Sequence, residues 1–408
     1  MKKTLLVSAL AVSFAGVAHA ESSVTLYGIV DAGIGYTQTK TTGANVVDAN
    51  GNVIATNATK KTRDFGLNNG AKQQSRFGLK GIEELGNGTA AIFQLESGFD
   101  LETGSTGDSL FNRRAIIGLT GESWGTLTIG RQHNVADDIL APIDPFGTDW
   151  GQAGANSTFG GSISAVQTPT IKYLSPNFEG FKFGLAVSGS DSKVKTTALN
   201  YKNVDKKQDG GVSVGLGYDN GPLSLAATFD YSRQKDKETL NGVNTTDIDS
   251  KAKAWAIGAA YDFDVVKLHL GYGQQRDGFV NDVNEDATRN GVANYGLFDA
   301  TQQVAHVIYG GDNISNKGLR AQSWFGGFTV PVADNGKALF SYQGGRIKHN
   351  SYNGRVNTHI YSLGYQHDLS KRTNVYVLGS YGEAKSSGYE RRVKSRTTQA
   401  IVGLQHHF

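Results

Sequence analysis

Four aspartates lie in one long segment, residues 133–170. Neither lysine nor arginine occurs between Arg131 and Lys172. Carboxylates gathered in this way need cations from other parts of the fold, because unpaired acids in a confined space are costly to hold. Opposed acidic and basic side chains around such a space would select among charged solutes. The acids of this acidic segment are Asp137, Asp138, Asp144 and Asp149.

The sequence on both sides of the acidic segment alternates apolar and polar residues, which is the period of a β-strand. About sixteen such strands can be assigned from residue 23 to the end of the chain. The acidic segment falls between the fifth strand, residues 125–132, and the sixth, residues 170–174. Residues 37–70, rich in Thr, Asn and Gly, show only a weak pattern and are assigned no strand.

The connections between these strands alternate in length. Short turns such as residues 86–88 and 219–222 alternate with long polar connections such as residues 193–210 and 233–251. Antiparallel barrels of the outer membrane have short turns at one rim and longer loops at the other. Closing the sheet also leaves no unpaired strand edge in lipid. The pattern predicts an all-β chain, a 16-stranded antiparallel transmembrane β-barrel whose bore takes up the acidic segment.

The composition fits a barrel better than a soluble core. Hydrophobic residues make up only 38%, and 53 of the 408 residues are glycine, as expected when only alternate strand residues face lipid. No stretch after the first twenty residues is long and apolar enough for a transmembrane helix. There is no cysteine and therefore no disulfide framework. The near-neutral charge, without a basic stripe, argues against nucleic-acid binding.

The first twenty residues have the three parts of a secretory signal peptide. Lys2 and Lys3 form a basic start, residues 5–17 form an apolar run, and Ala18, His19 and Ala20 form a cleavage site. We therefore expect residues 1–20 to be removed and residues 21–408 to form one barrel domain.

Strand phase indicates which basic residues face the bore. Alternation places Arg76, Lys80 and Lys172 on the inward side of their strands. Arg114 is preferred to Arg113, because the apolar residues that follow then face lipid. These four bases are expected to face the acids of the acidic segment. The alternative is that they are solvated charges at a rim.

Two short motifs could fix the acidic segment to the wall. One is Pro145, Phe146 and Gly147, and the other is residues 159–161, which read Phe-Gly-Gly. Phenylalanine would pack against the barrel, and glycine would adopt the positive φ of a tight turn. Ordinary turn chemistry explains the same residues equally well.

Five motifs together resemble the general porins of β-proteobacteria, the Neisseria, Bordetella and Burkholderia type. They are SSVTLYGIVDAG at residues 22–33, SRFGLKGIEELGNGTAAIFQLESGF at residues 75–99, GRQ at residues 130–132, APIDPFG at residues 141–147 and GLQHHF at residues 403–408. The resemblance covers nearly all of residues 21–408. It implies a sixteen-stranded homotrimeric porin of the cell outer membrane, in contact with lipid and lipopolysaccharide, which needs no cofactor. It also implies that the third external loop, between strands five and six, narrows a channel for passive diffusion of ions and small polar solutes.

The resemblance also assigns roles near the chain end and at the subunit contact. Phe408 resembles the terminal signal read by the barrel-assembly machinery, although His406 stands where an apolar residue is usual. Arg131 has the phase of the lipid face, where an arginine at the midplane would cost about 2–4 kcal/mol. It could instead lie near the rim, sit at a bulge, or pair across the trimer interface with an acid of the second loop. Those acids are Glu96, Asp100, Glu102 and Asp108.

Two other functions stay open on the sequence alone. An outer-membrane barrel can be a protease or a phospholipase, but the chain has no HExxH, phosphate-loop, GxSxG or dinucleotide motif. A substrate-specific channel would need an aromatic ladder in the lumen, and none is clear. His406 and His407 point to opposite faces of a strand and cannot chelate one metal. The preference for cations or anions stays open.

Overall fold

The computed structural model describes residues 23–47, 53–106, 109–198, 201–278, 317–350, 354–387 and 392–408. The expected signal peptide, residues 1–20, lies outside these ranges. Within them, seventeen strands form one antiparallel sheet that closes on itself, because β1 pairs with β17 as well as with β2 and β3. The strands are β1 (Ser23–Val47), β2 (Val53–Asn69), β3 (Arg76–Gly86), β4 (Thr89–Gly98), β5 (Arg114–Gly121), β6 (Gly125–His133), β7 (Val166–Leu174), β8 (Phe181–Ala198), β9 (Tyr201–Asn220), β10 (Leu223–Leu240), β11 (Val243–Asp262), β12 (Lys267–Arg276), β13 (Leu319–Val332), β14 (Gly336–His349), β15 (Arg355–Asp368), β16 (Thr373–Ser387) and β17 (Lys394–His407).

β2 and β3 together occupy one position in the barrel. Both pair with the same edge of β1, with Ala32 opposite Asn69 of β2 and Ile29 opposite Arg76 of β3. Residues 70–75, which we name the wall insert, interrupt this position. The seventeen strands therefore fill sixteen positions, and the prediction of a 16-stranded antiparallel barrel is confirmed.

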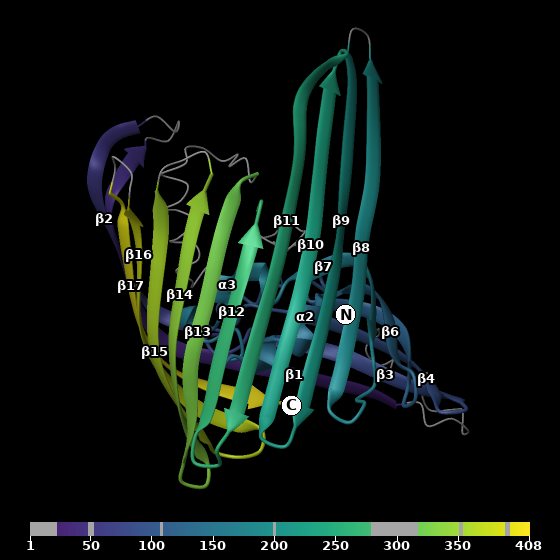
Figure 1. Cartoon of the computed structure of the whole chain (residues 1–408), viewed down its shortest axis with the longest axis vertical. Helices are drawn as coiled ribbons and strands as arrows, with labels where there is room; N and C mark the ends of the chain where they lie inside the picture. The colour runs from purple at the N-terminus through teal and green to yellow at the C-terminus, as the bar shows by residue number, and fades with distance from the viewer. Residues whose placement is uncertain are drawn as a thin grey trace, which may run out of the picture.

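The two rims of the barrel differ. Figure 1 shows short turns along the lower rim, and it shows β8 to β11 rising well above their neighbours at the upper rim. The short connections include residues 87–88, 221–222 and 333–335. The chain ends by pairing with the first strand, because the backbones of Phe408 and Gly28 exchange two hydrogen bonds of 3.1 Å. This asymmetry agrees with the alternating connection lengths in the sequence.

Residues 37–70 contain strands, and the sequence-based assignment was wrong here. β1 continues to Val47 and β2 spans Val53–Asn69, with Lys40 opposite Lys61. Polar side chains occupy both faces of this hairpin, so the alternation that marks a lipid-facing strand is missing. Backbone pairing does not require that alternation, and it continues into the polar part of the hairpin.

Outward side chains of the barrel are apolar, and inward ones are small or polar. On β8, Leu185 and Val187 are 45% and 50% exposed, whereas Ala186 between them is fully buried. This is the two-residue period of a strand with one face toward lipid. In the described part of the chain, no helix is long and apolar enough to cross a membrane.

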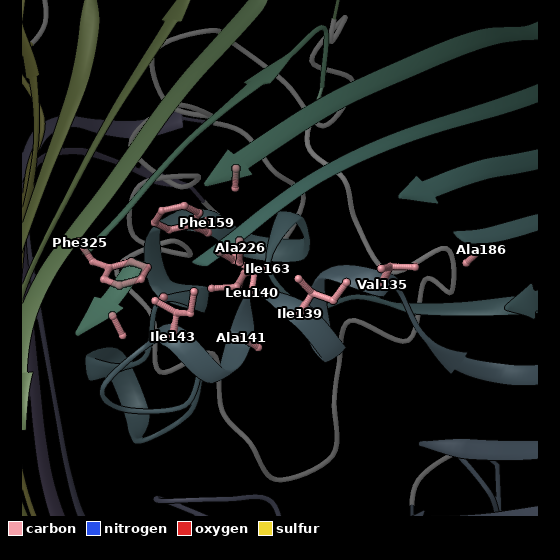
Figure 2. Packing of buried hydrophobic residues seen from close by; sticks show 13 residues of the cluster. Val135, Ile139, Leu140, Ala141, Ile143, Phe159, Ile163, Ala186, Ala226 and Phe325 are labelled. Atoms are coloured by element: carbon pink, nitrogen blue, oxygen red, sulfur yellow. The ribbon is translucent and has the colours of Figure 1, made fainter. Parts of the chain in front are cut away.

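Residues 134–165, which we name the inner loop, connect β6 to β7 and pack against the inside of the wall. Figure 2 shows Leu140, Ile143 and Phe159 of this loop grouped beside the strands. The ring of Phe159 meets Phe325 of β13 edge-on, with centroids 5.6 Å apart. Alanines on the wall leave room for these side chains. The helical turns of the inner loop are α2 (Val135–Ile139), η1 (Ala141–Ile143), η2 (Gly151–Ala153), α3 (Asn156–Phe159) and η3 (Gly160–Ser162).

Candidate pore constriction

The first turn of the inner loop holds two acids against the wall. α2 follows β6 almost directly, so Asp137 and Asp138 lie close to the strands on either side of the loop. Asp138 Oδ2 lies 2.7 Å from Lys172 Nζ on β7. Asp137 Oδ2 lies 3.5 Å from the Arg114 guanidinium at the start of β5. The structure therefore brings together two of the predicted acids and two of the predicted bases.

The surroundings of Asp137 favour its charged form. Burial alone would raise the pKa of this carboxyl, but nearby groups reverse the shift and hold the pKa below its usual range. These groups are His133 at 3.9 Å, the Ser164 hydroxyl, which donates over 2.6 Å, and Arg114. The carboxylate is therefore ionised at neutral pH and matches the charge of Arg114.

A second group of charges surrounds Glu96 on β4. Arg113 Nε lies 2.7 Å from the Glu96 carboxylate, and the Tyr27 hydroxyl donates to the same carboxylate over 2.9 Å. The charges of Glu96, Arg113 and Asp149 also act on Arg76 at the start of β3. Arg113 was not predicted to face the bore. It lies one residue before β5, where strand phase no longer fixes the direction of the side chain.

Lys80 lies apart from these ion pairs. Its side chain is exposed, and Nζ is 5.6 Å from the centre of the Tyr27 ring. Lys80 pairs with Gln94 across the strands and lies four residues beyond Arg76 along β3. It contributes positive charge to the same wall and touches no acid of the inner loop.

Asp144 forms no ion pair within the described residues, and its carboxylate serves the turn of the inner loop, although the residue also lines a cavity beside that loop. The residue is 4% exposed, and its carboxylate accepts hydrogen bonds from the backbone N–H groups of Phe146, Thr148 and Ala155. Burial raises the pKa of this carboxyl to about 6, against the three backbone donors that favour its charge. Asp144 thus organises the turn of the inner loop. Asp149 remains half-buried within charge range of Arg76.

The predicted anchor around Phe146 lies against the wall. Phe146 is 2% exposed, and its ring meets Trp150 edge-on at 5.5 Å. A Cβ atom at Gly364 of β15 would be only 2.8 Å from the Phe146 ring, so the glycine makes room for it. Gly147 has φ of 61°, which favours glycine. Pro145 lies against Gly327 of β13.

The wall insert receives the far end of the inner loop, which sequence reasoning missed. The Asp31 carboxylate of β1 accepts hydrogen bonds from the backbone of Gln73, the Tyr376 hydroxyl and Gln405 Nε2, which together fix the insert. The backbone N–H of Trp150 in the inner loop donates a hydrogen bond to the carbonyl oxygen of Lys72 in the wall insert. In the sequence, the only indication of this contact is that strand phase places Asp31 on the inward face of its strand.

Gln152 adds a third link between the inner loop and the end of the chain. Its backbone N–H donates to Gln399 Oε1 over 3.1 Å, and its Nε2 donates to Ser380 Oγ over 2.8 Å. These partners lie on β17 and β16, more than two hundred residues further along the chain. The inner loop is therefore held along its length, first by β5 and β7 and finally by β16 and β17.

Arg131 lies at a β-bulge, which was one of three sequence-based alternatives. The β6–β7 register shifts between Gly130 and Gln132. Arg131 nevertheless stays opposite Ala115 of β5, in the outward phase of Ile129. Its Nε donates to the Asn112 carbonyl of the same chain over 2.7 Å. Of its suggested partners, Glu96 is already paired with Arg113 and Asp100 accepts hydrogen bonds from its own loop. Glu102 is exposed, and Asp108 lies outside the described residues.

Comparisons with known proteins agree with this architecture. The family model described as Gram-negative porin matches residues 7–388. An outer membrane porin protein of Bordetella pertussis is 36% identical over the full length of both chains, and outer membrane porin protein 32 of Delftia acidovorans is 28% identical over the same share. The solved anion-selective porin from Comamonas acidovorans superposes with a TM-score of 0.60 at 24% identity, covering 95% of this chain and 100% of that one.

The family resemblance in the motifs is thus confirmed over nearly the whole chain. A closed sheet with an apolar outer face requires lipid around it and a polar lumen within. The chain belongs to the Gram-negative porin family, and it forms a water-filled channel of the outer membrane through which ions and small hydrophilic solutes diffuse.

Proposed function

We propose that the inner loop sets the narrowest part of the channel and that this constriction favours small anions modestly over cations. An imbalance of ion pairs carries the proposal. The acids Glu96, Asp137 and Asp138 each have a basic partner within 4.0 Å. Within the described ranges, Arg76 and Lys80 form no ion pair at that distance. Glu96 and Asp149 act on Arg76 from further away, and the two bases together leave an excess of positive charge on the wall that passing ions meet.

The reversal potential of single channels under a salt gradient tests this proposal. We expect an anion-favouring potential for the unaltered channel and a shift toward zero in Arg76→Gln. Arg233→Gln is the matched control, because Arg233 pairs with Asp249 at 2.8 Å and lies near the upper part of β10. A cation-favouring potential in the unaltered channel, or equal potentials in Arg76→Gln and the unaltered channel, would contradict the proposal.

We also propose that the chain assembles as a homotrimer. Large apolar side chains such as Leu26 and Ile129 are exposed on the outer face of the early strands, and Glu102 is exposed on the connection between β4 and β5. A structure of OmpT from Vibrio cholerae, with a TM-score of 0.54 and 14% identity, is described as a trimer form. Light scattering of detergent-extracted protein is expected to give the mass of a trimer, and a monomer at every concentration would contradict this.

We further propose that solutes pass through the channel passively and that the protein has no enzymatic activity. We also propose that the barrel-assembly machinery recognises Phe408 when it inserts the protein into the lipid and lipopolysaccharide of the outer membrane. Membership of a channel family supports the first proposal. The exposed Phe408 ring at the closing pair with Gly28 supports the second. In liposome swelling, solutes should enter by size and emerge unchanged. Deleting Phe408 should strongly lower the amount of protein in the outer membrane. It should lower the yield of purified protein folded into detergent much less.

A further inference from the structure

A polar cavity of about 690 Å³ lies below the inner loop, between it and the short turns of the lower rim. Phe146 and Trp150 of the inner loop line one side. The other side is formed by β14, β15 and their turns, which contribute Lys337, Gln366 and Asp368. None of these three residues belongs to the proposed constriction.

Lys337 and Asp368 present opposite charges that do not meet. Lys337 stands opposite Gln366 across β14 and β15, and Asp368 lies two residues further on the same face. The Cα atoms of such a diagonal pair are about 7–8 Å apart. In the part of the chain that the structure describes, Lys337 makes no ion pair, and Asp368 accepts a hydrogen bond only from Gln366 Nε2, at 2.6 Å. This wall thus carries a cation and an anion that do not pair with each other, and Asp334 and Lys371 of the neighbouring turns also line the cavity.

Gln366 adds an unmatched acceptor to the same wall. The residue is 6% exposed, and its Oε1 has no hydrogen-bond donor among the described residues. A buried amide oxygen without a donor is unfavourable, and because almost none of its surface is accessible, a bound molecule would reach it only if the Gln366 side chain turned toward the cavity. Lys72 at the edge of the cavity is already occupied, because its Nζ donates to Asn374 and Gln405.

We propose that this cavity binds a small zwitterion, a free α-amino acid, on its way through the channel. The carboxylate would lie at Lys337, and the ammonium would lie at Asp368. The carboxylate and the ammonium of an amino acid are carried by the same carbon atom, so one molecule can make charge-assisted hydrogen bonds to a cation and an anion of the same wall. A simple anion or a neutral polyol would leave Asp368 or both charges unmatched. The proposal rests on solutes of this size entering the channel.

Current noise of single reconstituted channels tests the binding, with L-alanine as the probe. Lactate and glycerol are comparison solutes of similar size, of which one lacks the ammonium and the other lacks both charges. We expect L-alanine to add noise that saturates with concentration in the unaltered channel. The apparent affinity should be about fivefold weaker in Lys337→Met and in Asp368→Asn. Lys267→Met is the matched control, since Lys267 lies on β12 outside the cavity and should leave the affinity unchanged.

Equal L-alanine affinity in Lys337→Met, Asp368→Asn and the unaltered channel would overturn the proposal. Lactate or glycerol acting as strongly as L-alanine would also overturn it. The salt conductance and reversal potential, recorded on the same channels, report separately on the constriction. If they follow the expected pattern while L-alanine binding fails, the proposed cavity site is lost and the proposed constriction stands.

Discussion

The backbone N–H of Trp150 donates a hydrogen bond to the carbonyl oxygen of Lys72 over 3.2 Å, and the Lys72 Nζ lies 5.4 Å from the centre of the Trp150 ring. One residue belongs to the inner loop and the other to the wall insert. Because Asp31 and Tyr376 fix the wall insert, the position of Trp150 is defined by the barrel itself. The inner loop is therefore a part of the wall structure at this point.

Trp150→Ala is expected to loosen the far end of the inner loop. The side chain is 5% exposed and packs on Phe146 and Tyr376, so truncation should destabilise the docked loop by about 3–5 kcal/mol. Single channels of the variant should show larger current fluctuations. Trp255→Ala, on the outer face of β11, is the control and should leave the fluctuations unchanged. Current fluctuations in Trp150→Ala equal to those of the unaltered channel would show that Trp150 does not hold the inner loop in place.

Gly364→Ala is expected to displace Phe146. The added Cβ would lie 2.8 Å from the Phe146 ring and 3.3 Å from Trp150, so the inner loop must shift. Gly379→Ala is a matched control, since a Cβ there meets no atom within 4 Å. The conductance should change in Gly364→Ala and not in Gly379→Ala. The same conductance in both variants would show that Phe146 does not fix the loop.

Asp144→Ala is expected to disorder the turn of the inner loop. Three backbone N–H groups lose their acceptor, and each buried donor left without a partner costs about 1–3 kcal/mol. Limited proteolysis should cut the loop faster in this variant. Pro142→Ala, at an exposed position of the same loop, should be cut at the unaltered rate. Resistance of Asp144→Ala to proteolysis would argue against its structural role.

Lys172 and Asp138 are expected to be energetically coupled. Lys172→Met leaves Asp138 without its 2.7 Å partner, and Asp138→Asn leaves Lys172 buried with an unmatched charge. The double variant should therefore be more stable than the sum of the two single effects predicts, by about 1–3 kcal/mol. Urea unfolding of the four proteins gives this coupling energy. Strict additivity would show that the contact contributes nothing.

Most of the barrel could be predicted because a lipid-facing strand must alternate. Leu185 and Val187 are visible in the sequence for this reason, and so is the inward phase of Lys172. Where lipid contact ends, the pattern ends too, and β2 was missed although its backbone pairs with β1. The wall insert was also missed, because nothing in the residue types of 70–75 distinguishes an interrupted strand from a turn.

The constriction was predicted less completely than the barrel. Asp137 and Asp138 meet Arg114 and Lys172 because strand phase and loop position fix them. Asp144 has the same residue type, but its carboxylate is taken up by backbone donors of its own turn, and the sequence does not show which acids will be used this way. Arg113 faces Glu96 from a position before β5, where periodicity carries no information.

The contacts of Gln152 have a consequence for the order of folding. Its partners Gln399 and Ser380 lie on the last strands of the barrel, and Lys72 depends on Gln405 of the same region. Contacts between such distant parts of a chain form late, because the ends of a long loop must first be brought together. A barrel whose last strand has not yet met its first lacks the part of the wall that receives Gln152. The narrow passage is therefore a late product of folding, and an unfinished barrel would be wider than the finished one.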